Sequence, residues 1–221
     1  MSFSAETTAQ QVSDAFAQEI AGKNGSLKLV EFFLHPADVE AVLITGTSIG
    51  GIGFETARVM AKYANLVIIS GYNHERLQLS EDAIKKEFPT ANIRKLTLDL
   101  SSLAAVRASA AEVNAYPEPL HVLINNAIAP VVALHETVDG FESQMAIGHI
   151  GPFLFTNLIA PKLIAARTAT YTPRVVFVSS LGHVFGTGVH LDTFGKLLPG
   201  KYKNIMEPYV ETKSANIMNA I

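Results

Sequence analysis

After residue 40 the chain alternates short, continuously apolar runs with stretches in which apolar residues recur every three or four positions. A continuous apolar run is typical of a parallel strand that is covered on both faces, and the three-to-four spacing is typical of an amphipathic helix. The runs predict five strands, at residues 41–45, 66–70, 93–98, 122–125 and 175–179. This alternation predicts an α/β fold, a Rossmann-type doubly wound parallel sheet with helices on both faces.

The stretches between the strands predict helices of different exposure. Residues 57–64 repeat apolar positions at helical spacing, and residues 75–88 are polar with one apolar stripe, so the second helix should lie on the outside. Ser101 or Ser102 can cap a helix that continues to about Ala115. Residues 153–166 form the most apolar stretch, but it is shorter than the roughly 20 residues that span a bilayer. We therefore expect a buried helix there and no membrane span.

Two regions fall outside this alternation. Residues 24–40 have a mixed composition and separate a helix-like N-terminal segment from the first strand. Residues 182–208 are rich in Gly, Pro and Lys and show no period, which predicts a long loop of the kind that shapes a substrate site. We therefore divide the chain into a helical extension with an unusual insert, residues 1–40, and a nucleotide-binding domain, residues 41–221.

Composition narrows the classes of function. Hydrophobic residues make up 48% and charged residues 17%, which indicates a well-buried core, and the net charge of −3 is interspersed, which argues against nucleic-acid binding. The absence of cysteine excludes disulfides and thiolate chemistry. The N-terminus lacks the features of a secretory signal, so we expect a cytoplasmic location. His121, His135 and His149 show no metal-ligand spacing, and we expect them at the polar surface and no metal site.

The first strand leads into the glycine-rich sequence TGTSIGGIG, residues 45–53, which opens a helix. The pyrophosphate of a dinucleotide needs close backbone approach without Cβ atoms and the free N–H groups of a helix N-terminus. The strand–turn–helix context favours this interpretation over an ordinary turn, in which Gly50 would serve as an additional turn glycine. The predicted cofactor-binding residues of this loop are Gly46, Ser48, Gly51, Ile52 and Gly53.

Tyr209 and Lys213 lie four residues apart in the sequence YVETK, so on a helix both project from one face. A nearby ammonium favours phenolate over phenol, and such a tyrosine can exchange a proton with a substrate hydroxyl or carbonyl while a hydride moves to or from a nicotinamide. An isolated match of this kind would indicate only a solvated helix face. Here the glycine loop accompanies it.

The chain also carries three further segments in a fixed order, and with them it resembles the short-chain dehydrogenase/reductase family over about residues 41–220. These segments are LDLSSLAAVR at 98–107, LINNAI at 123–128 and VVFVSS at 175–180. More narrowly, the chain is similar to the fungal retinol-dehydrogenase-like and WW-domain oxidoreductase-like members, on the segments 140–163 and 179–186.

The resemblance implies roles for individual residues in cofactor binding. Asp99, after the third strand, would lie near the adenine, and Asn126, after the fourth, would lie beside a ribose. Lys213 would bind the nicotinamide ribose. As alternatives, Asp99 is a helix N-terminal carboxylate and Asn126 is a turn residue that bridges two strands, a role that can coexist with ribose contact.

The resemblance also implies the catalytic residues. Tyr209 would be the acid/base, and Lys213 would favour its ionised form. Ser180 would donate a hydrogen bond to the substrate oxygen, with the neighbouring Ser179 as the alternative.

Three departures from the family pattern bear on activity. Gly148 stands where the family has an asparagine that supports a water in the proton relay, and Ile128 replaces the glycine of an NNAG turn, where it would crowd the cofactor or change the turn. The chain ends at Ile221, whereas the family continues with further strands and a substrate-covering loop. We therefore expect a sheet without its last strands. Residues 175–179 would then form an exposed apolar edge, which favours homo-oligomerisation. Together with the insert at residues 24–40, the early end leads to the hypothesis of an imperfect gene model or a degenerate gene.

Cofactor choice is read at the end of the second strand. Residues 71–74, GYNH, contain no carboxylate that would repel a 2′-phosphate, and Ser48 could bind one, which favours NADP and leaves NAD open. We expect Arg76 to be a solvated helix residue. Two functions remain: an oxidoreductase that interconverts an alcohol and a ketone or aldehyde on a small hydrophobic substrate, or a non-catalytic relative that retains at most nucleotide binding.

Overall fold

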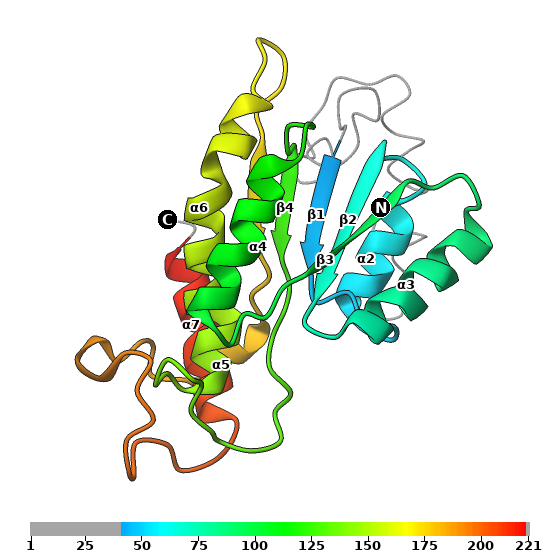
Figure 1. The fold of residues 1–221 in the computed structure, drawn as a ribbon. Coiled ribbons are helices and arrows are strands. Elements are labelled where there is room, and N and C mark those ends of the chain that lie inside the picture. The colour runs from blue at the N-terminus through cyan, green and yellow to red at the C-terminus, as the bar shows by residue number, and fades with distance from the viewer. Residues whose placement is uncertain (1–40, 220–221) are drawn as a thin grey trace, which may run out of the picture.

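The computed structural model describes residues 41–219, so the predicted N-terminal extension and insert lie outside the described residues. Five parallel strands form one sheet in the order β3-β2-β1-β4-β5 (Figure 1). The strands are β1 (Ala41–Thr45), β2 (Leu66–Gly71), β3 (Ile93–Thr97), β4 (Val122–Asn125) and β5 (Arg174–Phe177). The predicted Rossmann-type sheet is confirmed, and each predicted strand overlaps the observed one.

Helices cover both faces of the sheet, as predicted. α2 (Ile52–Met60) and α3 (His74–Glu87) lie on one face, and α4 (Leu103–Ala115) and α6 (Gly151–Ala165) lie on the other (Figure 1). Two separate hydrophobic cores result, because successive side chains of a strand point to opposite faces. The remaining helical elements are α5 (Ser143–Met145), the π-helix η1 (Ala146–Ile150), the 3₁₀ helices η2 (Leu181–Phe185) and η3 (Leu191–Thr193), and α7 (Glu207–Met218).

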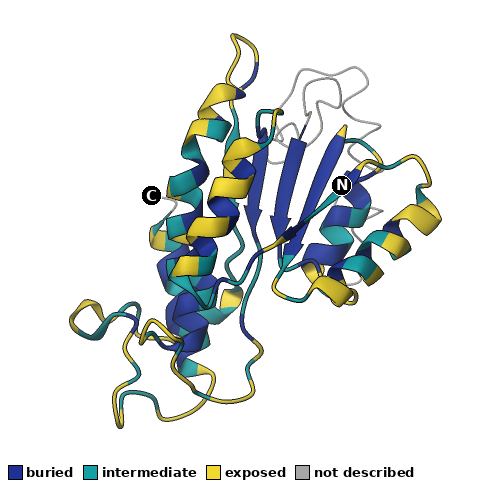
Figure 2. Cartoon of the chain, in the orientation of Figure 1, coloured by how far each residue is buried: buried dark blue, intermediate teal, exposed yellow. Residues whose placement is uncertain are grey.

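Strand β1 shows this division of the core. Val42 and Ile44 pack with residues of α2 and α3, whereas Leu43 packs with residues of α4 and α6. All five residues of β1 and all four of β4 are buried, and Figure 2 shows the central strands buried between helices with exposed outer faces. The continuous apolar runs in the sequence therefore reflect strands that are covered on both sides.

Side-chain caps fix the starts of α3 and α4. Ser102, rather than Ser101, caps α4, since its hydroxyl accepts a hydrogen bond from the N–H of Ala105. The side chain of Asn73 accepts the N–H of Arg76 at 2.9 Å and so fixes the start of α3 directly after β2.

The prediction of a buried helix at residues 153–166 holds for one face of the helix only. In α6, Phe155, Ile159 and Leu163 are buried, but Phe153 is 49% exposed and Ile164 is 69% exposed. Only one face of α6 packs on α4 and the sheet, so the apolar residues on its other face stay near the surface. None of the helices within residues 41–219 combines the length and apolarity that crossing a bilayer requires.

Strand β5 is the edge of the described sheet. It pairs with β4 alone among residues 41–219, and none of its four residues is fully buried. Val175 is exposed, in agreement with the predicted apolar edge.

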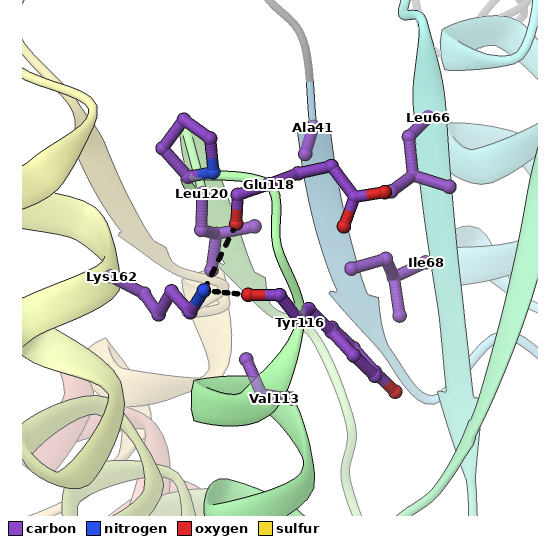
Figure 3. Close-up of a pocket in the computed structure, with 9 residues that line it drawn as sticks. Ala41, Leu66, Ile68, Val113, Tyr116, Glu118, Leu120 and Lys162 are labelled. Carbon is purple, nitrogen blue, oxygen red and sulfur yellow. Dashed lines mark hydrogen bonds between the residues drawn. The ribbon is translucent and has the colours of Figure 1, made fainter.

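A small cavity lies at the amino ends of β1 and β2, away from the strand ends that carry the predicted site (Figure 3). The ammonium of Lys162 donates to the backbone carbonyls of Tyr116 and Glu118 after α4, and Arg94 binds both carboxylate oxygens of Glu118 at 2.8 and 2.9 Å. This pairing lowers the pKa of Glu118 to about 2. The cavity has a volume of about 10 Å³, close to the size of one water. The contacts of Lys162 and Arg94 around it hold α4 to α6 and β3.

Candidate active site

A cavity of about 570 Å³ lies at the carboxyl ends of β1 and β4, where the strand order reverses. Open α/β sheets bind their ligands at this point, and the volume falls within the roughly 300–1,000 Å³ of small-molecule sites. The glycine loop, the carboxyl ends of the five strands and α7 contribute to its wall. Of the predicted site residues, those that line the cavity are Gly46, Ser48, Gly51, Ile52, Asp99, Asn126, Ser180, Tyr209 and Lys213.

Two glycines of the loop make close approaches that a side chain would block. Gly46 has a φ of +72°, and a Cβ atom there would lie 2.7 Å from the Cα of Ala127. Gly53 does not line the cavity; a Cβ atom there would lie 2.4 Å from Nδ2 of Asn126 and 2.5 Å from the carbonyl oxygen of Gly46. Gly53 therefore lets α2 pack closely on the ends of β1 and β4.

Asn126 joins the ends of β1 and β4. Its Nδ2 donates to the carbonyl oxygens of Thr45 at 2.9 Å and Gly46 at 3.2 Å, and the hydroxyl of Thr45 accepts the N–H groups of Asn126 and Ala127. The bridging role and the position on the cavity wall therefore coexist. Because these bonds are internal, the floor of the cavity is already ordered in the free protein.

Asp99 lines the cavity after β3 and also closes a turn. Its Oδ1 accepts the N–H of Ser101 at 2.9 Å and the hydroxyl of the same residue at 2.6 Å. The N–H of Leu103, at the start of α4, donates instead to Asp139. Asp99 is therefore not the N-cap of α4, but its carboxylate lies in the turn directly before that helix, so the helix-terminal alternative stays open.

Helix α7 presents Tyr209 and Lys213 to the same cavity, as their spacing predicts. Nζ of Lys213 lies 5.7 Å from the centre of the Tyr209 ring and donates to the carbonyl oxygen of Val178 at 2.7 Å. Lys213 is only 4% exposed, and this burial lowers the pKa of its ammonium.

The two serines after β5 have different partners. The hydroxyl of Ser179 donates to the backbone carbonyl of Lys213 at 2.8 Å, so it ties β5 to α7. The hydroxyl of Ser180 accepts the N–H of Gly182 at 3.0 Å, which leaves its own hydrogen available to a ligand. A Cβ atom at Gly182 would lie 3.3 Å from Oγ of Ser180 and 3.2 Å from the Tyr209 ring, so both groups border the same glycine.

The long loop predicted at residues 182–208 contains η2 and η3 and is fastened to α7 by Glu211. This carboxylate is 3% exposed, accepts the N–H of His190 at 3.0 Å and the hydroxyl of Tyr202 at 2.7 Å, and lies 3.4 Å from Nζ of Lys201. Glu211 stands between Tyr209 and Lys213 in the sequence, and its role was not recognised there, because a charged residue on a helix usually lies on a solvated face.

The departures at Gly148 and Ile128 are parts of one contact. Gly148 is buried in η1, and a Cβ atom there would lie 2.4 Å from Cδ1 of Ile128 and 2.5 Å from Cγ2 of Thr212 on α7. Ile128 lines the cavity, and its far end fills the space beside the glycine. The larger residue after β4 therefore fits because the residue in η1 has no side chain.

The expected surface role of the histidines is wrong for two of them. His121 is buried beside Tyr171, with ring centres 5.1 Å apart. His149 in η1 is half-buried and contacts the rings of Phe153 and Phe194, and its burial lowers its pKa. Within residues 41–219 no group of three or more histidine, aspartate or glutamate side chains could hold a metal ion.

The end of β2 forms another part of the wall. Tyr72, Asn73 and Arg76 line the cavity there, and the first and last of these are exposed. Arg76 was expected to be only a solvated residue, and the structure places it on the cavity wall as well.

Comparison with known proteins places the chain in a family. It belongs to the short-chain dehydrogenase family, whose sequence model matches residues 40–189. The chain is 36% identical over 208 residues to the short-chain dehydrogenase TIC 32 A, chloroplastic, of Brassica napus, which covers 90% of this chain and 63% of that protein. It is 38% identical over 166 residues to the WW domain-containing oxidoreductase of Danio rerio, which covers 74% and 38%. The predicted similarity to WW-domain oxidoreductase-like members is confirmed.

Other relatives extend the comparison. A polyprenol dehydrogenase of Mus musculus is 36% identical over 163 residues, covering 74% of this chain and 48% of that protein. A short-chain dehydrogenase of Sphingobium yanoikuyae in complex with NADPH has the same fold, with a TM-score of 0.61 and 20% identity over 82% of this chain and 63% of that one. The chain thus spans less than two thirds of the length of these curated relatives.

Proposed function

We propose that this chain is the nucleotide-binding and catalytic part of an NADP-dependent oxidoreductase that interconverts an alcohol and a ketone or aldehyde on a small hydrophobic molecule. One observation carries the proposal: a single cavity is lined by the glycine loop at one side and by Ser180, Tyr209 and Lys213 at the other. Family membership supports the class of reaction.

The residues present fit a dinucleotide. Gly46 and Gly51 bring the backbone of the glycine loop to the cavity wall, where a pyrophosphate would bind, and Asp99 and Asn126 line the same cavity for the adenosine and a ribose. When bound, the cofactor supplies or accepts the hydride. Lys213 would hold its nicotinamide ribose.

The protein's own groups would handle the proton. The Tyr209 hydroxyl donates a proton to a carbonyl oxygen during reduction and takes one from the alcohol during oxidation. Ser180, whose hydrogen is not used within the turn, donates to the same oxygen and orients it. The Lys213 ammonium lies next to the Tyr209 ring, 5.7 Å from its centre.

NADP rather than NAD is proposed from the wall at the end of β2. Tyr72, Asn73 and Arg76 line it without a carboxylate, and Ser48 faces the same cavity from the glycine loop. The complex of the Sphingobium yanoikuyae relative with NADPH is in keeping with this choice.

A non-catalytic relative that only binds the nucleotide is the second candidate. It is favoured by Gly148, since the family's asparagine at that position supports a water of the proton relay. A cytoplasmic location and self-association through β5 complete the proposal, and the chloroplastic relative shows that related sequences occur in another compartment.

The test combines binding with turnover. Titrating the purified protein with NADPH and NADH, followed by fluorescence, should give tighter binding of NADPH. On any ketone that the parent reduces, Tyr209→Phe should lower turnover by about 10²–10⁴-fold and leave NADPH affinity unchanged, because it removes only the acid/base group.

The matched control is Tyr116→Phe, which removes a hydroxyl that bonds Glu112 on the exposed side of α4. It should keep parental turnover. Parental turnover by Tyr209→Phe would refute the mechanism, and tight NADPH binding with no turnover on a panel of carbonyl compounds would favour the second candidate.

A further inference from the structure

The carbonyl oxygen of Val178, just past the end of β5, accepts two side-chain hydrogen bonds from α7. Nζ of Lys213 donates at 2.7 Å and Nδ2 of Asn216 donates at 3.4 Å. The N–H of Val178 donates to Asn125 on β4 at 2.9 Å. The acceptor of the Lys213 ammonium is thus a backbone group at the edge of the sheet, and its position depends on what holds it.

Asn216 is itself held by His149. Oδ1 of Asn216 lies 3.0 Å from Nδ1 of His149, and because the amide nitrogen is used at Val178, this oxygen is the acceptor and Nδ1 carries the hydrogen. The imidazole stacks on Phe153, with ring centres 6.4 Å apart, and meets the edge of Phe194 at 5.8 Å. The His149 side chain is therefore fixed by packing as well as by its hydrogen bond.

We propose that His149 and Asn216 are positioning residues that hold the Val178 carbonyl as the partner of the Lys213 ammonium. This inference rests on the proposed function for its catalytic meaning. The three residues connect η1, β5 and α7, so one chain of hydrogen bonds sets the position of Lys213 from outside its own helix.

The buried ammonium has few other groups to compensate its charge. Among residues 41–219, Lys213 forms no ion pair with a carboxylate, and Tyr209 faces it from the same helix. His149 faces it only through Asn216. The Val178 carbonyl therefore stabilises the charged form, while burial opposes it and lowers the pKa of Lys213. If the carbonyl moves away, the ammonium should lose its proton at a lower pH.

The experiment measures how the reactivity of Lys213 depends on pH in the full chain. Labelling with acetic anhydride at a series of pH values, read by mass spectrometry against the exposed Lys86, gives the pH at which Lys213 becomes reactive. His149→Phe keeps an aromatic ring between the two phenylalanines but removes the N–H donor, so it should move this midpoint down by about one pH unit. His149→Gln keeps a donor and should restore the parental midpoint.

Two further variants separate the loss of this chain of hydrogen bonds from general destabilisation of the fold. Asn216→Ala should give the same downward movement. Asn114→Ala removes a like bond, from a side-chain amide on α4 to the carbonyl of Leu158 on α6. Neither residue lines the cavity, so this variant should leave the midpoint unchanged. Melting temperatures identify any variant that does not fold. The comparison of His149→Phe with His149→Gln then decides whether the hydrogen bond of residue 149 sets the midpoint of Lys213.

The inference is overturned if a folded His149→Phe variant has the same midpoint as the parent. It is also overturned if His149→Gln moves the midpoint as far as His149→Phe does. The labelling needs neither cofactor nor turnover, so it can succeed although NADPH does not bind. Failure of NADPH binding in the parent would count against the proposed function alone.

Discussion

Replacing Gly148 by alanine tests whether the residues around η1 are interlocked. In an ordinary exposed helix this change stabilises by up to roughly 1 kcal/mol, because alanine is the better helix former. Here the added Cβ would lie 2.4 Å from Cδ1 of Ile128 and 2.5 Å from Cγ2 of Thr212, whereas carbon atoms in contact lie about 3.5–4.0 Å apart. Each neighbour must therefore move by about 1 Å.

The two neighbours differ in how readily they can move. Ile128 meets the new atom with the end of a flexible side chain, but Thr212 is fully buried and its hydroxyl donates to the carbonyl of Pro208 at 2.8 Å. We therefore expect Gly148→Ala to destabilise by about 1–3 kcal/mol, the usual cost of overpacking. For a domain of this size that lowers the melting temperature by roughly 2–4 °C for each kcal/mol.

Calorimetry on the variants and their combination provides the assay. Ile128→Val removes the nearest atom, so the double variant should lose less stability than the two single variants together. Gly71→Ala is the matched control, since its Cβ would meet only Leu77, at 3.7 Å, an ordinary contact. A Gly148→Ala variant as stable as the parent would refute the proposed packing of Gly148 against Ile128. So would a double variant whose loss of stability equals the sum of the losses of Gly148→Ala and Ile128→Val.

Three further predictions concern other parts of the molecule. Gly51→Val should abolish NADPH binding, measured by fluorescence titration, and keep the fold, because its φ of −98° suits valine while the branched side chain enters the phosphate approach. The pairing of Glu118 with Arg94 lowers the carboxyl pKa, so it should stabilise the fold above about pH 4.5, and this stabilisation should be lost as the pH falls toward 2. Glu118→Gln should remove it, which urea unfolding at several pH values would measure. Val175→Lys should reduce self-association through β5 in sedimentation experiments.

The sheet and the glycine loop were predictable because local chemistry determines them. Strands buried on both faces need continuous apolar runs, and a close approach such as that of Gly46 to Ala127 admits no side chain. The same reasoning brought Tyr209 and Lys213 to one face of α7, since helical spacing alone fixes that relation.

The contacts that the sequence did not predict join residues far apart in the chain. Ile128 and Gly148 are separate departures from the family pattern in the sequence. Their contact is visible there only as a larger residue than usual at position 128 and a smaller one than usual at position 148. His149 and Asn216 are 67 residues apart, and no spacing indicates their bond. The exposure of α6 was misjudged for a related reason, because composition reports how apolar a helix is and not how much partner surface it meets.

The fastening of the long loop by Glu211 also bears on how fast that loop can move. If residues 190 and 202 moved away, the carboxylate would stay buried without two of its donors, which is costly for a charged group. The loop therefore should not swing freely on the nanosecond scale of ordinary surface loops. Its opening belongs with local unfolding, on a scale of microseconds or longer, and involves the same helix that carries Tyr209 and Lys213. Movement of the loop and any disturbance of α7 would then be timed by one event.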